Sequence, residues 1–180
     1  MVVLKTIWGK NKEDIKLQAL TDDIIGGSSK SKIFISDDKE IIFNGEVSSK
    51  LGDKSYAAFK TSIINIEYSD EYDGVCIKIM GDGKKYRLVI RTTFKEDSIY
   101  FHRTFMTKPH EWQTHYISFD EFKAYYKYIR IPVLKINKTK MKSMGIMISD
   151  NQHGHFHLAV SDIAFYKGKV EHIISRKLLK

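Results

Sequence analysis

The stretch VCIKIMGDGKKYRLVI, residues 75–90, decides the fold class. Apolar side chains occupy every second position on both sides of its central turn, at Val75, Ile77, Ile79, Tyr86, Leu88 and Ile90. Such period-two alternation is typical of strands with one face in the core. The Asp-Gly pair within Gly81-Asp82-Gly83 favours the backbone angles of a tight turn. We therefore predict two antiparallel strands joined as a β-hairpin.

The same alternation recurs along the chain. Further runs of this kind span residues 41–47, 57–66, 99–105, 112–119, 144–149 and 156–165. Helical periodicity is confined to a short turn at 120–126 and a basic amphipathic segment at 167–180. Eight or more strands with little helix predict an all-β, antiparallel β-sandwich, and a jelly roll accommodates so many strands better than a small barrel does.

The length indicates one domain. A chain of 180 residues with 42% apolar residues can bury one substantial core, and no linker or internal repeat interrupts it. We expect a single β-sandwich domain over residues 1–180, with its core at about 8–166 and a basic C-terminal tail at 167–180. The lone cysteine, Cys76, cannot form an intramolecular disulfide, which fits a reducing compartment.

The formal charge of +8 comes from 30 Lys and Arg against 22 Asp and Glu. Such a surface attracts acidic partners, including the faces of acidic proteins and anionic membranes, so a peripheral membrane contact is left open. The lysines are spread along the chain, which is also the pattern of an ordinary solvated surface. We do not expect nucleic acid as the main partner.

No catalytic motif is present in the sequence. It contains no G-x-S-x-G elbow, no H-E-x-x-H pair and no Walker loop. His153, His155 and His157 alternate with Phe156 and Leu158, so core-facing apolar residues would leave the imidazoles on the opposite, wetter face. We predict no catalytic residue, no cofactor and no metal site.

Several segments, taken in order, resemble the complex I intermediate-associated protein 30 family. They are DDIIGGS (22–28), FNGEVS (43–48), YDGV (72–75), GDGKKY (81–86), WQT (112–114), ISFDEF (117–122), SMGI (143–146) and GHFHL (154–158). Ser55, Ile25 and Ser118 depart from residues common in that family. The resemblance implies a galactose-binding-like jelly roll that takes part in building mitochondrial respiratory complex I without catalysing a reaction. It also implies a place in the matrix or on the matrix face of the inner membrane.

The implied partners are complex I subunits and other assembly factors. The sequence leaves open whether the chain is a transient factor or a retained accessory subunit. Two further functions stay open, a carbohydrate-binding module and an RNA-binding module, because rings beside cations suit either ligand. The candidate partner-binding or motif residues are Asp22, Asp23, Gly26, Gly27, Ser28, Asp82, Trp112, Tyr125 and Tyr126. We favour the interpretation of the two tyrosines as anchors of a loop in the core.

Overall fold

The computed structural model describes residues 3–9, 16–62 and 69–169. These residues form strands joined by turns and short 3₁₀ helices, and none of the described helices is long or apolar enough to span a membrane. The strands are β1 (Val3–Trp8), β2 (Leu17–Thr21), β3 (Lys30–Ile35), β4 (Ile41–Val47), β5 (Ala57–Ser62), β6 (Gly74–Met80), β7 (Lys85–Arg91), β8 (Tyr100–Met106), β9 (Trp112–Ser118), β10 (Lys123–Tyr126), β11 (Ile129–Ile131), β12 (Ser143–Ile148) and β13 (Gly154–Lys167). The 3₁₀ helices are η1 (Asp22–Ile25), η2 (Gly52–Lys54), η3 (Ser69–Glu71), η4 (Phe119–Glu121) and η5 (Lys138–Lys140).

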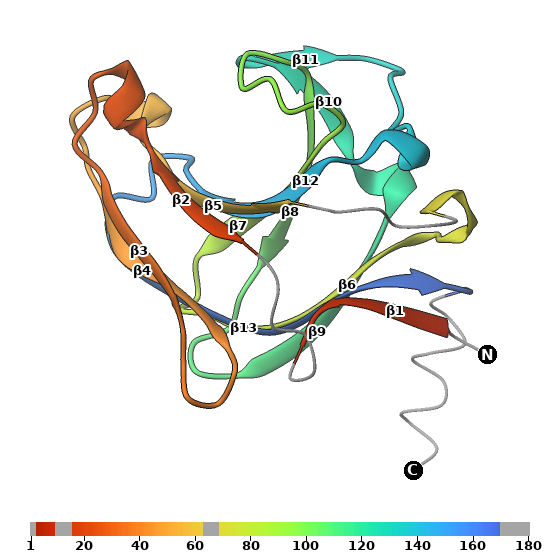
Figure 1. Ribbon diagram of the computed structural model, residues 1–180. Helices are drawn as coiled ribbons and strands as arrows, with labels where there is room; N and C mark the ends of the chain where they lie inside the picture. Colours follow the sequence, from red (N-terminus) through yellow and green to blue (C-terminus); the bar gives the residue numbers. More distant parts are fainter. Residues whose placement is uncertain (1–2, 10–15, 63–68, 170–180) are drawn as a thin grey trace.

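Two antiparallel sheets lie face to face (Figure 1). A six-stranded sheet has the order β3-β4-β13-β6-β9, with β1 also paired to β13. A seven-stranded sheet has the order β11-β10-β8-β7-β12-β5-β2. The all-β antiparallel sandwich predicted from the alternation is thereby confirmed.

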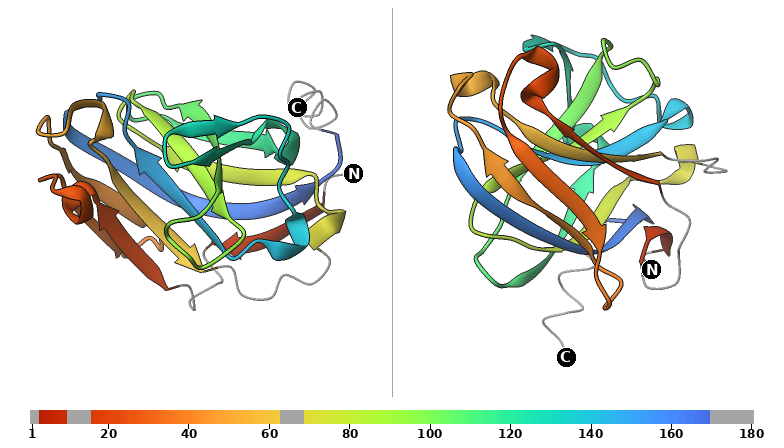
Figure 2. Two further views of the ribbon diagram at one scale, coloured as in Figure 1. Left: turned by 90° about the horizontal axis from the view of Figure 1, so that it is seen from above. Right: turned by 60° about the vertical axis from the view of Figure 1, so that its left-hand side comes forward.

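Strand β13 is the longest strand and the central strand of the six-stranded sheet. Along one edge it pairs first with β4 and then with β1, and along the other edge it pairs with β6. Its register with β6 shifts between Val160 and Asp162, which marks a bulge in this long strand that pairs with three neighbours. Figure 2 shows the two layers from further sides, with η1 where the chain passes from β2 to β3.

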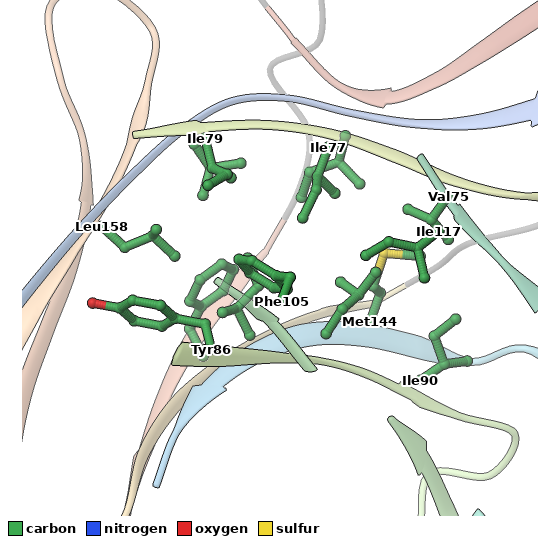
Figure 3. Close-up of a cluster of buried hydrophobic side chains, with 14 of the residues drawn as sticks. Val75, Ile77, Ile79, Tyr86, Ile90, Phe105, Ile117, Met144 and Leu158 are labelled. Atoms are coloured by element: carbon green, nitrogen blue, oxygen red, sulfur yellow. The ribbon is translucent and has the colours of Figure 1, made fainter. Parts of the chain in front are cut away.

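The predicted hairpin over residues 75–90 is wrong. Strand β6 pairs with β13 and β9, whereas β7 pairs with β12 and β8 in the other sheet. The turn is therefore a crossing between sheets, and the two apolar sets meet across the core instead of lying side by side. Figure 3 shows Ile77 and Ile79 of β6 opposite Tyr86 and Ile90 of β7. Alternation reports which face of a strand is buried and carries no information about its hydrogen-bonded neighbour.

The core between the sheets is rich in aromatic and branched side chains. Phe43 and Phe59 pack edge to face at 5.1 Å between ring centroids, one from each sheet. Residues 120–126, predicted as a helical turn, hold the end of η4 and then strand β10. Strand β1 begins at Val3, ahead of the expected core boundary at 8, while residues 170–180 of the predicted tail lie outside the described residues. The single-domain assignment stays a prediction.

Truncation of Ile77 to alanine tests the shared core. The Ile77 side chain is fully buried and faces the seven-stranded sheet, so Ile77→Ala should lower the free energy of unfolding by about 2–5 kcal/mol. Thr114→Ala, on the exposed outer face of β9, is the matched control and should change it by less than about 0.5 kcal/mol. Urea unfolding at neutral pH measures both, and equal effects would contradict the assigned faces.

Candidate functional site

The outer face of the seven-stranded sheet is the best candidate for a binding surface. The sheet curves so that the face turned away from the core is concave (Figure 1). Register pairs align outward-facing side chains in rows across the strands. These rows are Ala58, Met147, Arg87 and Thr104; Lys60, Gly145, Val89, His102 and Lys123; and Ser143, Arg91, Tyr100, Tyr125 and Arg130.

The concave face is basic. It carries Lys60, Arg87, Arg91 and Lys123, and it also carries Arg130 at the end of one row. Glu96 forms an ion pair with Lys60, and Asp150 forms one with Arg87. The basic side chains therefore outnumber their counterions, and the surface favours an acidic partner.

Three rings stack on this face. The Tyr125 ring lies 4.4 Å from the His102 ring and 6.0 Å from the Tyr100 ring, all nearly parallel. The Arg91 guanidinium lies 5.1 Å from the centroid of Tyr100. Tyr125 and His102 cover each other, whereas Tyr100 lies 6.0 Å from both rings and is displaced sideways. A flat platform for a sugar or a base needs an uncovered ring face.

His102 is neutral at physiological pH. Burial, reinforced by the positive charges of Arg87 and Lys123, lowers its pKa to about 4. Its Nδ1 atom and the Nε atom of Arg87 have no hydrogen-bond partner among the described residues. Both atoms are buried beneath the concave face and are not exposed to a ligand on it.

The Asp22-Asp23 segment supports the fold locally. The Asp22 carboxylate is fully buried and accepts hydrogen bonds from the Ser29 amide at 2.9 Å, the Ser29 hydroxyl at 2.7 Å and the Tyr56 amide at 3.1 Å. It thereby ties η1 to the start of β5. The Asp23 carboxylate accepts from the Thr21 hydroxyl and from the Ile24 amide in the same turn.

The residues that follow η1 have steric roles. Gly26 ends the helix in the left-handed region, at a φ of 85°. A Cβ at Gly27 would lie 2.1 Å from an Asp22 carboxylate oxygen, so the close approach requires glycine. The Ser28 and Ser48 hydroxyls are hydrogen-bonded at 2.7 Å. This loop is thus held by internal contacts.

Asp82 holds the crossing between the sheets. One carboxylate oxygen accepts from the Lys84 amide and the Tyr86 hydroxyl, both at 3.1 Å, and the other accepts from the His157 amide at 3.0 Å. One side chain therefore joins the turn, β7 and β13. Burial, followed by the charge of Asp82 and its hydrogen bond, raises the pKa of Tyr86 far above its usual value.

The remaining predicted residues lie apart from one another. Trp112 is on the outer face of the six-stranded sheet, with the Lys78 ammonium 5.8 Å from its ring. Tyr125 lies on the concave face. Its neighbour Tyr126 lies on the opposite side of β10, and the Lys127 ammonium is 5.3 Å from its ring. The predicted residues do not converge on one site, and of them only Tyr125 lies on the concave face.

The three histidines also lie apart from that face. The His153 Nε2 atom is 3.2 Å from the Gly52 carbonyl oxygen, and His155 and His157 are exposed on the outer face of β13. Within the described ranges, no three His, Cys, Asp or Glu side chains are grouped so that they could hold a metal ion.

A hollow of about 530 Å³ lies beside the concave face, between β8 and β9. His115, Phe105 and Glu121 contribute to its lining, and none of the nine candidate partner-binding or motif residues does. Burial lowers the pKa of His115, so its imidazole is neutral at physiological pH. The alternation of residues 85–91 already indicates outward Arg87 and Arg91, but only the sheet order brings them beside His102 and Lys123.

The sequence matches the family of complex I intermediate-associated protein 30 over residues 7–160. No curated protein matches it in sequence.

The fold matches carbohydrate-binding modules of known structure. A family 11 module of a cellulosomal cellulase from Clostridium thermocellum aligns with a TM-score of 0.67 and 13% identity, over 94% of this chain and 96% of that one. The same organism's family 11 module with a β-1,3-1,4-mixed-linked tetrasaccharide aligns at 0.64 and 13% identity, over 90% and 94%. A family 29 module with cellulohexaose aligns at 0.58 and 8% identity, over 95% of each chain. At these identities the likeness shows the jelly-roll fold alone.

Replacement of Asp22 should destabilise the protein. An asparagine side chain has a single acceptor oxygen for the three donors that the carboxylate now satisfies, so Asp22→Asn should lower the free energy of unfolding by about 1–3 kcal/mol. Asp23→Asn, in the exposed part of the same turn, is the control and should cost less than about 1 kcal/mol. If urea unfolding ranks the two variants in the opposite order, the stabilising role assigned to the Asp22 hydrogen bonds is wrong.

His102 should make stability depend on pH. Its pKa is about 4 in the folded chain and close to 6.5 when unfolded, so the unfolded chain binds more protons between these values. The free energy of unfolding is therefore not reduced by His102 above pH 6.5, and it falls as the pH decreases toward 4. His102→Leu should flatten this part of the profile of unfolding free energy, measured by urea unfolding from pH 7 to pH 4. An unchanged slope in the variant would show that His102 is not the responsible group.

Proposed function

Because the chain belongs to the complex I intermediate-associated protein 30 family, we propose that it is a non-catalytic protein that binds complex I components during assembly of the mitochondrial respiratory complex. The supporting observation is the family match over residues 7–160, which takes in every strand from β2 to β12. The proposed partners are complex I subunits and other assembly factors. The proposed place is the mitochondrial matrix or the matrix face of the inner membrane.

The concave face is the proposed docking surface for these partners. Arg91 and Lys123 extend its positive charge, and the seven-stranded sheet holds them on a rigid framework. A preformed surface loses little conformational entropy on binding, so most of the contact energy is available for affinity. Charge complementarity also speeds encounter with an acidic subunit and rejects basic ones. This face therefore suits selective, reversible association.

Carbohydrate binding is the second candidate. The observation in its favour is the jelly-roll likeness to carbohydrate-binding modules, together with three rings on the concave face. The stacking of Tyr125 on His102 weighs against it, because one face of each of these two rings is already covered. RNA binding rests on the positive charge and on rings beside cations, and it would appear as an affinity that falls steeply with salt.

Affinity recovery of the tagged chain from mitochondria, resolved by native size and identified by mass spectrometry, tests the proposal. We expect complex I subunits in particles smaller than the finished complex. Their presence only at full size would identify a retained accessory subunit instead. Recovery without any complex I component would overturn the proposal, and recovery of glycoproteins or RNA would favour the alternatives.

Charge reversal on the concave face tests the docking surface. Lys123→Glu should reduce recovery of complex I subunits several-fold, because it places like charge against an acidic partner. Lys32→Glu makes the same change at an exposed outward position of β3 in the opposite sheet, and it should leave recovery unchanged. Equal recovery with both variants would move the docking surface away from the concave face.

A further inference from the structure

Exposed apolar side chains gather at one edge of the seven-stranded sheet. Of the 13 large apolar side chains that are exposed among the described residues, five lie within residues 126–134. Val133 is 96% exposed, Ile129 is 71% exposed and Tyr128 is 64% exposed, and Tyr126 and Leu134 complete the group. We call residues 126–134 the β11 edge. So much apolar surface in one short segment marks an interaction site.

The β11 edge protrudes. Strand β11 is the outermost strand of its sheet, pairs only with β10, and lies at the rim of the concave face (Figure 1). The loop between β7 and β8 is beside it, since the Tyr100 hydroxyl bonds the Lys127 carbonyl and Asp97 lies 4.0 Å from the Lys127 ammonium. That loop adds Phe94, which is 72% exposed.

Val133 is held in an unfavourable conformation. Its φ is 67°, a left-handed value that is rare for a β-branched residue. An almost fully exposed side chain gains nothing from burial in the folded chain, so packing does not explain why valine is present. An apolar side chain that is strained and also exposed is better explained by a contact made outside the chain.

The sequence within and just after this edge is rich in basic residues, although the Lys138 ammonium is bonded to the Asp70 and Tyr72 carbonyl oxygens at η3. Residues 124–142 include six basic residues and no acidic one, namely Lys127, Arg130, Lys135, Lys138, Lys140 and Lys142. The ion pairs of Lys127 with Asp97 and of Lys135 with Asp120 are exposed and therefore weak. Arg130 and Lys140 have no ion pair within the described residues. The lysines that look evenly spread along the whole sequence thus have a local excess here.

We propose that the β11 edge docks on the surface of a lipid bilayer that contains anionic lipid. Cores of protein interfaces are depleted in charged residues and need a matching shape, whereas this segment carries Lys127 and Arg130 between apolar side chains that are individually exposed. A bilayer accepts protruding apolar side chains without a matching shape, attracts lysine and arginine to anionic headgroups, and favours tyrosine at its interface. Ile129 and Val133 enter the headgroup region, and Lys127 and Arg130 of the same segment contact phosphates.

Sedimentation of the full chain with protein-free vesicles tests this inference. We expect binding to phosphatidylcholine vesicles that contain about one quarter phosphatidylglycerol, weak binding to phosphatidylcholine alone, and loss of binding as salt rises. The double variant Ile129→Ser, Val133→Asn should bind the anionic vesicles at least about tenfold more weakly. Lys127→Gln and Arg130→Gln should each weaken binding about fivefold.

Phe34→Ser is the matched control, because Phe34 is 48% exposed and points outward from β3 in the opposite sheet. It should bind vesicles as the unaltered chain does. Thermal unfolding confirms that the variants fold, and Val133→Asn should not lower the midpoint, since asparagine tolerates a positive φ. Absence of vesicle binding, or equal binding by the double variant, would overturn the inference.

The vesicles contain no complex I protein, so this result is independent of the proposed function. If the double variant loses complex I subunits in affinity recovery and the unaltered chain does not bind vesicles, the β11 edge is a protein interface and the membrane inference fails. Vesicle binding with unchanged recovery of complex I subunits would support two separate surfaces.

Discussion

The constraint on which the rest of the structure depends is that two apolar sheet faces must meet, so the chain has to pass repeatedly from one sheet to the other. The crossing between β6 and β7 shows how this is achieved. The Asp82 carboxylate accepts hydrogen bonds from the Lys84 amide in the turn, from the Tyr86 hydroxyl of β7 and from the His157 amide of β13. A single half-buried carboxylate thus links β7 of one sheet to β13 of the other at the crossing.

Asp22 solves the same problem at another crossing. Its carboxylate satisfies donors from Ser29 and Tyr56, where the chain leaves β2 for η1 and then enters β3. Both aspartates belong to the segments that carry the family resemblance, and both have a structural explanation in this chain. Residues that identify a family can therefore be those that build its fold, while the side chains that meet a partner lie elsewhere.

Burial of one face of each sheet leaves the other face free for binding. On the seven-stranded sheet the outward positions carry Arg87, Arg91 and Lys123, and the row that contains Tyr125 ends at Arg130 on the β11 edge. The concave face and the β11 edge thus share a rim and a positive charge. They differ in shape, because the concave face is held by paired strands and the β11 edge protrudes with apolar side chains. This difference is why we assign them a protein partner and a lipid surface respectively.

The sequence by itself predicted eight of the described strands, the buried faces of β6, β7 and β13, and the family, but it did not predict β1, β2, β3, β10 or β11. Residues 41–47 were predicted as a strand with its present bounds, and Ile77 and Leu88 were placed in the core. Only the tertiary structure decided which strands pair, that β6 and β7 lie in different sheets, and that Tyr125 and Tyr126 have separate surroundings. The reason is physical. Period-two alternation records the burial of a strand face, whereas its neighbours are set by long-range packing and chain crossings, which leave no local periodic signal.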